Sequence, residues 1–154
     1  VSGVLFCLIT GLLLMSAQMN VILSESGLTE EVENGAFLMP KFGSDGLLTA
    51  VAVDAVSGKV LMVAHMNKDA LVKTIETNEA WYYSRSRSAL WRKGETSGQI
   101  QKIREIQVDC DQDALVLMVD VGGDGGCCHT GRPTCFYRRI DGLDSEHRVK
   151  LARI

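Results

Sequence analysis

The sequence predicts an α+β fold: a compact single domain of mostly antiparallel strands with one main helix. Short β-type runs separated by turn residues fill most of the chain between residues 48 and 140, and one segment between them has helical spacing. No internal repeat and no interdomain linker interrupts this pattern. A length of 154 residues gives room for one domain with a hydrophobic core.

Strands are predicted where apolar and β-branched runs are bounded by turn formers. The clearest pair flanks Ser57 and Gly58, a combination typical of a hairpin turn. The polar stretch 84–98 is expected to form loops around one short strand. The other expected strands span residues 48–55, 59–65, 80–84, 103–109, 114–121 and 135–140.

The main helix is expected over residues 68–76. Asn67 precedes it as an N-cap, because its side chain can accept a hydrogen bond from the first turn. Leu71 and Ile75 are four residues apart, so they share the face that packs on the sheet. Asn78 is a suitable C-terminal stop, since asparagine tolerates the left-handed conformation.

The two ends of the chain differ from this regular domain. Residues 1–23 are mostly apolar, but no Lys or Arg precedes Lys41, so the basic flank of a signal peptide or membrane anchor is missing. We interpret Met19 as the natural start, with residues 1–18 as upstream read-through; a single anchor helix is the alternative. The expected organisation is completed by an acidic leader at 24–44, the domain at 45–140 and a charged tail at 141–154.

The overall charge and the cysteine count limit the possible functions. A net charge of −3 provides no general attraction to nucleic acid or to an anionic membrane, so neither partner is expected. Five cysteines, an odd number, exclude a complete disulfide framework. Three of them crowd into residues 127–135, which favours a metal site in a reducing compartment, the cytoplasm.

The cysteine-rich segment has the composition of a zinc site. Cys128 and Cys135 are separated by a turn containing glycine and proline, which can bring two thiolates onto one ion. Cys110 is the best candidate for a third ligand. His129 is either a fourth ligand or a general base, and we favour the base because three sulfurs and a water complete a tetrahedron. The alternative is a set of buried, inert cysteines, of which Cys127 would be one.

An acidic segment surrounds Cys110. If the strand from Ile103 continues, its alternation places Cys110 on one face and three carboxylates on the other. Oxygen ligands of this kind suit Mg²⁺ or Ca²⁺. A solvated acidic turn is the alternative. The carboxylates are those of Asp109, Asp111 and Asp113.

A basic segment follows the helix. Guanidinium and ammonium groups near glycines and small hydroxyls are what phosphate oxygens need, and nearby aromatic rings can stack on a base. Single-stranded nucleic acid binding and a solvated basic face are the alternatives. The candidate substrate-binding residues are Arg85, Arg87, Trp91, Arg92, Lys93, Thr96 and Ser97.

Four of these segments, in this order along the chain, closely resemble motifs of the phosphoribosyl-AMP cyclohydrolase family, in its monofunctional form. The similarity extends from about Asp45 to Arg138, which is nearly the whole expected domain. The four motifs are Tyr82–Arg87, Leu90–Gly98, Asp109–Asp113 and Cys128–Arg132.

The resemblance implies hydrolysis of the N1–C6 bond of the adenine ring in 1-(5-phosphoribosyl)-AMP, a step of histidine synthesis that uses zinc-activated water. It implies zinc on Cys110, Cys128 and Cys135 and magnesium on the three aspartates. It also implies an intertwined homodimer in which each zinc site is shared between subunits. The competing functions are a structural zinc module that binds RNA through residues 85–93, and a thiol redox or metal-buffering protein; neither explains the aspartates.

Overall fold

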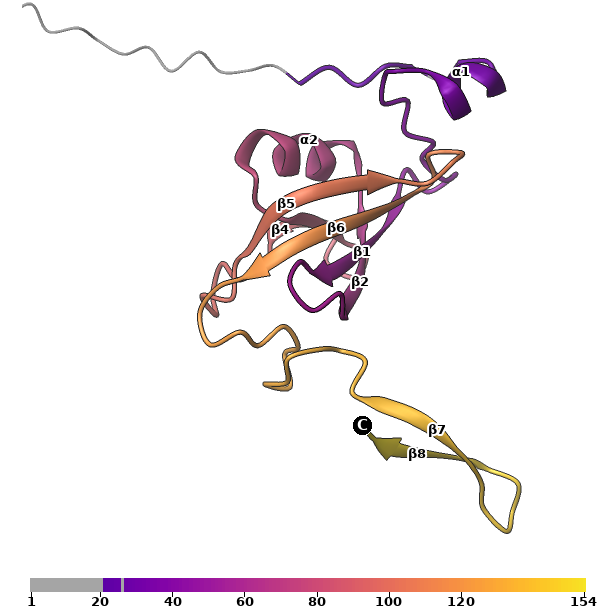
Figure 1. The fold of residues 1–154 in the computed structure, drawn as a ribbon, viewed down its shortest axis with the longest axis vertical. Coiled ribbons are helices and arrows are strands. Elements are labelled where there is room, and N and C mark those ends of the chain that lie inside the picture. Colours follow the sequence, from indigo (N-terminus) through magenta and orange to yellow (C-terminus); the bar gives the residue numbers. More distant parts are fainter. Residues whose placement is uncertain (1–20, 26) are drawn as a thin grey trace, which may run out of the picture.

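The structure, a computed structural model, describes residues 21–25 and 27–154 and shows a mixed α+β architecture (Figure 1). The expected start at Met19 and the read-through at 1–18 lie outside the described residues, as does most of the apolar stretch 1–23. None of the helices in the described ranges is long and apolar enough to cross a lipid bilayer.

A six-stranded sheet in the order β4-β3-β2-β1-β6-β5 forms the centre of the fold. The pairing of β1 with β6 is parallel, and the other four pairings are antiparallel, so the predicted mostly antiparallel sheet is confirmed. The strands are β1 Leu48–Asp54, β2 Val60–Met66, β3 Trp81–Ser84, β4 Ala89–Arg92, β5 Gln101–Val108 and β6 Ala114–Val121.

The first hairpin turn and the two ends of the main helix lie where the sequence predicts them. Gly58 has φ +70°, the left-handed conformation that glycine adopts without strain, and it closes the turn between β1 and β2. Helix α2 spans Lys68–Thr77, and Asn67 caps it by accepting a 2.9 Å hydrogen bond from the Ala70 amide. Asn78 ends the helix at φ 53°.

The hydrophobic core lies between α2 and the sheet. Leu71 of α2 is fully buried, and Ile75 packs against the same cluster, as their four-residue spacing predicts. From β6, Leu115, Leu117 and Val119 alternate into the core, because successive side chains of a strand point to opposite faces. These residues anchor β6 in the core beside the edge strand β5, and the loops at the two ends of β6 carry the candidate sites.

Two parts of the structure differ from the prediction. The acidic leader contains a short helix, α1 Thr29–Asn34. The last expected strand begins three residues late, and the charged tail continues it as a hairpin of β7 Arg138–Leu143 and β8 Val149–Arg153. The hairpin stands apart from the sheet (Figure 1), and every residue of β7 is exposed. Only Val149–Leu151 alternates between apolar and charged residues, and β7 has no regular alternation, so the tail carries a weak strand signal.

Candidate active site

A cavity of about 350 Å³ brings the basic segment together with the cysteine-rich segment. His129 and Cys135 line it, and so does the additional thiol of Cys127. All but one of the predicted substrate residues line it as well, the exception being Arg85. The basic residues and hydroxyls that share this cavity are Arg87, Arg92, Lys93, Thr96 and Ser97, with Trp91 beside them.

A tight loop after β4 shapes one wall of this cavity. Gly94 has φ +84°, and a Cβ atom at this position would lie 2.2 Å from the backbone of Gln99 and Ile100. The Gly98 amide donates a 2.8 Å hydrogen bond to the Gly94 carbonyl, which closes the loop. Only glycine fits at position 94, so the lysine before it and the hydroxyl residues after it are held at the cavity.

The cationic side chains of the wall have different surroundings. The Arg92 Nη1 atom lies 3.0 Å from Glu79 Oε2, so this guanidinium is engaged in an ion pair within the wall. Arg87 is exposed, and its Nε donates to the Ser84 hydroxyl at 3.2 Å. Lys93 is only 8% exposed and forms no salt bridge with any described residue. Arg87 and Lys93 are therefore the cations of the cavity that a ligand can use.

Backbone hydrogen bonds fold the cysteine-rich segment into a compact turn. The amides of Cys127 and Cys128 both donate to the Arg132 carbonyl, at 3.0 and 2.9 Å. The Cys135 amide donates to the Leu61 carbonyl of β2 at 2.7 Å, which ties the turn to the sheet. The turn thereby brings Cys128 near enough to Cys135 for each thiol to influence the pKa of the other.

The two thiols differ in acidity. The Thr130 hydroxyl donates to Cys128 Sγ at 3.0 Å, and this hydrogen bond lowers the pKa of Cys128. Burial, together with the neighbouring charge of Cys128, raises the pKa of Cys135 to about 11. His129 Nδ1 lies 4.0 Å from Cys128 Sγ, and its ring lines the cavity. Two soft sulfur ligands on one turn beside an imidazole fit a zinc ion.

Cys110, the predicted third ligand, lies at the other end of β6. It sits in the turn between β5 and β6, whereas Cys128 follows the loop after β6. A strand of eight residues spans about 25 Å. Within one chain, Cys110 therefore does not reach Cys128 and Cys135. Among the described residues, the one group of three or more potential metal ligands close together is that of Asp109, Asp111 and Asp113.

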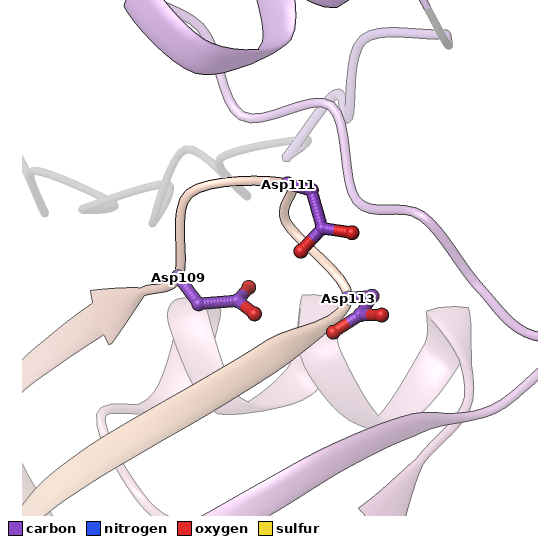
Figure 2. A group of neighbouring side chains, drawn as sticks. All are labelled: Asp109, Asp111 and Asp113. Carbon is purple, nitrogen blue, oxygen red and sulfur yellow. The ribbon is translucent and has the colours of Figure 1, made fainter.

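The carboxylates of Asp109, Asp111 and Asp113 face a common space inside this turn (Figure 2). Their ligand atoms lie within 4.8 Å of one another. The prediction that strand alternation groups them is wrong, because β5 ends at Val108 and a turn brings them together instead. The nearby charge of Asp111 raises the pKa of Asp113, as expected for clustered like charges. This donor set fits a hard divalent cation.

Sequence reasoning missed the contacts that surround this turn. Lys41 of the leader places its Nζ 3.0 Å from Asp111 Oδ2. Gln112 is buried at the tip of the turn and adopts φ 60°. Leader and turn are 70 or more residues apart along the chain, so no local pattern indicates their contact.

A buried polar network beneath the cavity was also missed. The Tyr82 hydroxyl donates to Gln101 Oε1 at 2.7 Å, and Gln101 Nε2 donates to Cys127 Sγ at 3.2 Å. Burial raises the pKa of both Tyr82 and Cys127, so both side chains stay protonated at neutral pH. Gln101 is the first residue of β5 and follows a polar loop, so no local pattern in the sequence indicates this network.

A larger cavity of about 770 Å³ lies between the base of the β7–β8 hairpin and the turn after β1. Its lining is mostly apolar and includes Val60, Phe136, Tyr137 and Ile154. None of the residues predicted for catalysis, substrate binding or metal binding lines it. The smaller cavity, which combines thiols, an imidazole and free cations, is therefore the candidate active site.

Comparison with known proteins is consistent with this site. A family model described as phosphoribosyl-AMP cyclohydrolase matches residues 62–137, which include every residue that lines the candidate active site. The phosphoribosyl-AMP cyclohydrolase of Rhodopseudomonas palustris (strain TIE-1) is 62% identical over 112 residues, 73% of this chain and 74% of the relative. Proteins of the same name from Bradyrhizobium diazoefficiens and Brucella canis are 56% and 54% identical, over 75% and 80% of this chain and 81% and 87% of their own lengths. With motifs, cavity and sequence similarity in agreement, this chain belongs to the phosphoribosyl-AMP cyclohydrolase family.

Proposed function

We propose that this protein hydrolyses the N1–C6 bond of the adenine ring in 1-(5-phosphoribosyl)-AMP, as a step of histidine biosynthesis. The observation that carries the proposal is the shared cavity, in which His129 and Cys135 face the same space as Arg87 and Lys93. A ring held by its phosphates at the basic wall would present C6 to the thiol side. Ribosylation of N1 makes the ring cationic, which makes C6 easier to attack.

The side chains that would hold zinc are Cys128 and Cys135, completed by Cys110 of a second subunit. When bound, zinc would supply a Lewis acid that lowers the pKa of water to about 7. His129 would then take the proton of the attacking water and return a proton to the opened ring as a general acid. Its place on the cavity wall next to Cys128 supports this role.

The basic wall would position the substrate. Arg87 and Lys93 would bind phosphate oxygens, assisted by the hydroxyls of Thr96 and Ser97. Arg92 would act mainly by stiffening the wall, because Glu79 already pairs with it. Trp91, which packs on Tyr82 with ring centroids 5.1 Å apart, would offer its remaining face to the adenine.

A homodimer would complete the zinc site. The position of Cys110 and Cys128 at opposite ends of β6 supports this arrangement, because a second copy would have to supply the missing thiol. The hairpin of β7 and β8 supports it too, since an isolated two-stranded hairpin is marginally stable and this one exposes Ile140, Val149 and Leu151. The aspartate turn would hold magnesium, and the free thiols fit the reducing cytoplasm.

The reaction is tested by following the ultraviolet absorbance of phosphoribosyl-AMP with the purified protein, before and after a chelator removes zinc. We expect ring opening that disappears on zinc removal and returns when zinc is added. Absence of ring opening by zinc-loaded, dimeric protein would refute the proposed function.

Sharing of the zinc site between subunits is tested by mixing two inactive variants, Cys110→Ser and Cys128→Ser, under conditions that exchange subunits. Random exchange makes about half of the dimers mixed, and each mixed dimer has one intact site of two, so about a quarter of wild-type activity should return. No recovery is expected if all three thiols come from one chain. A mixture of Cys128→Ser with Cys135→Ser is the matched control, because both substitutions lie in the same half-site.

A further inference from the structure

The leader crosses the aspartate turn and adds a positive charge to it. Lys41 Nζ lies 3.0 Å from Asp111 Oδ2 and, through this ion pair, lowers the pKa of that carboxyl group. Asp111 raises the pKa of Lys41, and the charges of Asp113 and Asp109 add to this effect, so the ammonium group interacts with all three carboxylates. Among the described lysines and arginines, Lys41 is the one that forms a salt bridge to this turn.

The backbone fixes Lys41 independently of its ion pair. The Lys41 amide donates to the Gln112 carbonyl at 2.8 Å, and the Met39 amide donates to Gln112 Oε1 at 2.7 Å. Gln112 Nε2 in turn donates to the Val32 carbonyl at 2.8 Å. The same buried glutamine thus anchors the leader at three places, so the lysine remains beside the turn even when Asp111 has another partner.

We propose that Lys41 sets the ion preference of the aspartate turn by reducing its charge from −3 to −2, which matches a divalent cation. The inference rests on the proposed function, in which these aspartates hold magnesium. A site of charge −3 would bind cations more tightly but would also favour trivalent ions. Lys41 is therefore a specificity-determining residue: it weakens cation binding at the turn, favours divalent over trivalent ions, and allows a bound divalent ion to exchange.

Coulomb's law gives the size of the effect. A positive charge about 5 Å from a bound ion in a solvated site opposes binding in proportion to the charge of that ion. Removing it should tighten binding of a divalent ion on the order of tenfold at low salt, and of a trivalent ion on the order of thirtyfold. Both gains should shrink as salt rises, because the turn is exposed.

The experiment uses zinc-loaded, full-length protein and two probe ions. Free Mn²⁺ is counted by electron paramagnetic resonance, and Tb³⁺ binding is followed by its luminescence. The variants Lys41→Gln, Lys41→Glu and Lys41→Arg vary the charge at this position in steps. Lys68→Gln removes the same charge from the exposed side of helix α2, and Asp111→Asn identifies the signal that belongs to the turn.

We expect Lys41→Gln to bind both ions more tightly, with the larger gain for Tb³⁺, and Lys41→Glu to extend both gains. Lys41→Arg and Lys68→Gln should bind both ions like the wild type. Equal affinities in wild type and Lys41→Gln, or weaker binding in the variant, would overturn the role of Lys41. If no protein binds Mn²⁺ in an Asp111-dependent way, the cation site and this inference both fail, whereas the ring-opening assay still decides the proposed reaction.

Discussion

Replacing Gln101 with methionine perturbs the buried network beneath the active-site cavity. Methionine keeps the length of glutamine but removes the oxygen that accepts the hydrogen bond of the Tyr82 hydroxyl. Both side chains are fully buried, so the hydroxyl would be left without a partner, at a cost of about 1–3 kcal/mol. Loss of the hydrogen bond to Cys127 adds little, because a thiol sulfur is a weak acceptor. We therefore expect Gln101→Met to lower the free energy of unfolding by about 2 kcal/mol.

A double-mutant cycle separates this network from ordinary packing. Tyr82→Phe alone leaves the Gln101 oxygen unpaired, whereas Tyr82→Phe with Gln101→Met removes both polar partners. The double variant should be more stable than the sum of the single effects by about 1–2 kcal/mol. Urea unfolding of metal-free protein at a fixed concentration measures all four free energies. Strictly additive effects would refute the claim that these two side chains depend on each other for hydrogen bonding.

Three further predictions concern the thiols, the basic wall and the core. Thr130→Val removes the hydroxyl that lowers the pKa of Cys128, so zinc affinity should fall about tenfold near neutral pH. Above the pKa values of the thiols, the affinities of variant and wild type should become equal. Competition with a chelator across a range of pH measures both affinities, and Thr130→Ser, which keeps the hydroxyl, is the control. Arg87→Ala should raise KM strongly and leave bound zinc unchanged, whereas Arg85→Ala, outside the cavity, should have the smaller effect; loss of zinc in Arg87→Ala would contradict a substrate role. Leu71→Ala should lower the free energy of unfolding by about 2–5 kcal/mol, and a loss below 1 kcal/mol would show that the helix does not anchor the core as described.

The sequence predicted those parts of the fold that depend on neighbours along the chain. Asn67 and Asn78 delimit α2 because capping and the left-handed stop are interactions within one turn. Ser57 and Gly58 mark the β1–β2 turn for the same local reason. The substrate-binding residues were predicted for a similar reason, because most of them are close to Gly94 in the chain and the tight loop at this glycine holds them at the cavity.

The errors lie where local signals compete. The expected strand 103–109 ends earlier, because the turn needs Asp109 to accept a hydrogen bond from the Ala114 amide at 3.0 Å. The charged tail forms β7 and β8, but its sequence shows little of the apolar alternation that predicts a strand. Helix α1 has only six residues, and so short a helix gives almost no periodic signal.

Residue types and their spacing were enough to identify the chemical groups of the candidate sites: thiols and an imidazole in one turn, carboxylates in another, and cations before a glycine-containing loop. Which of these groups lie together could be read from the folded chain alone. It placed the basic wall against Cys135 and His129, separated Cys110 from them by the length of β6, and laid Lys41 on Asp111. The physical reason is that residue type and spacing encode ligand chemistry and local geometry, whereas contacts between segments 70 residues apart depend on how the whole core packs.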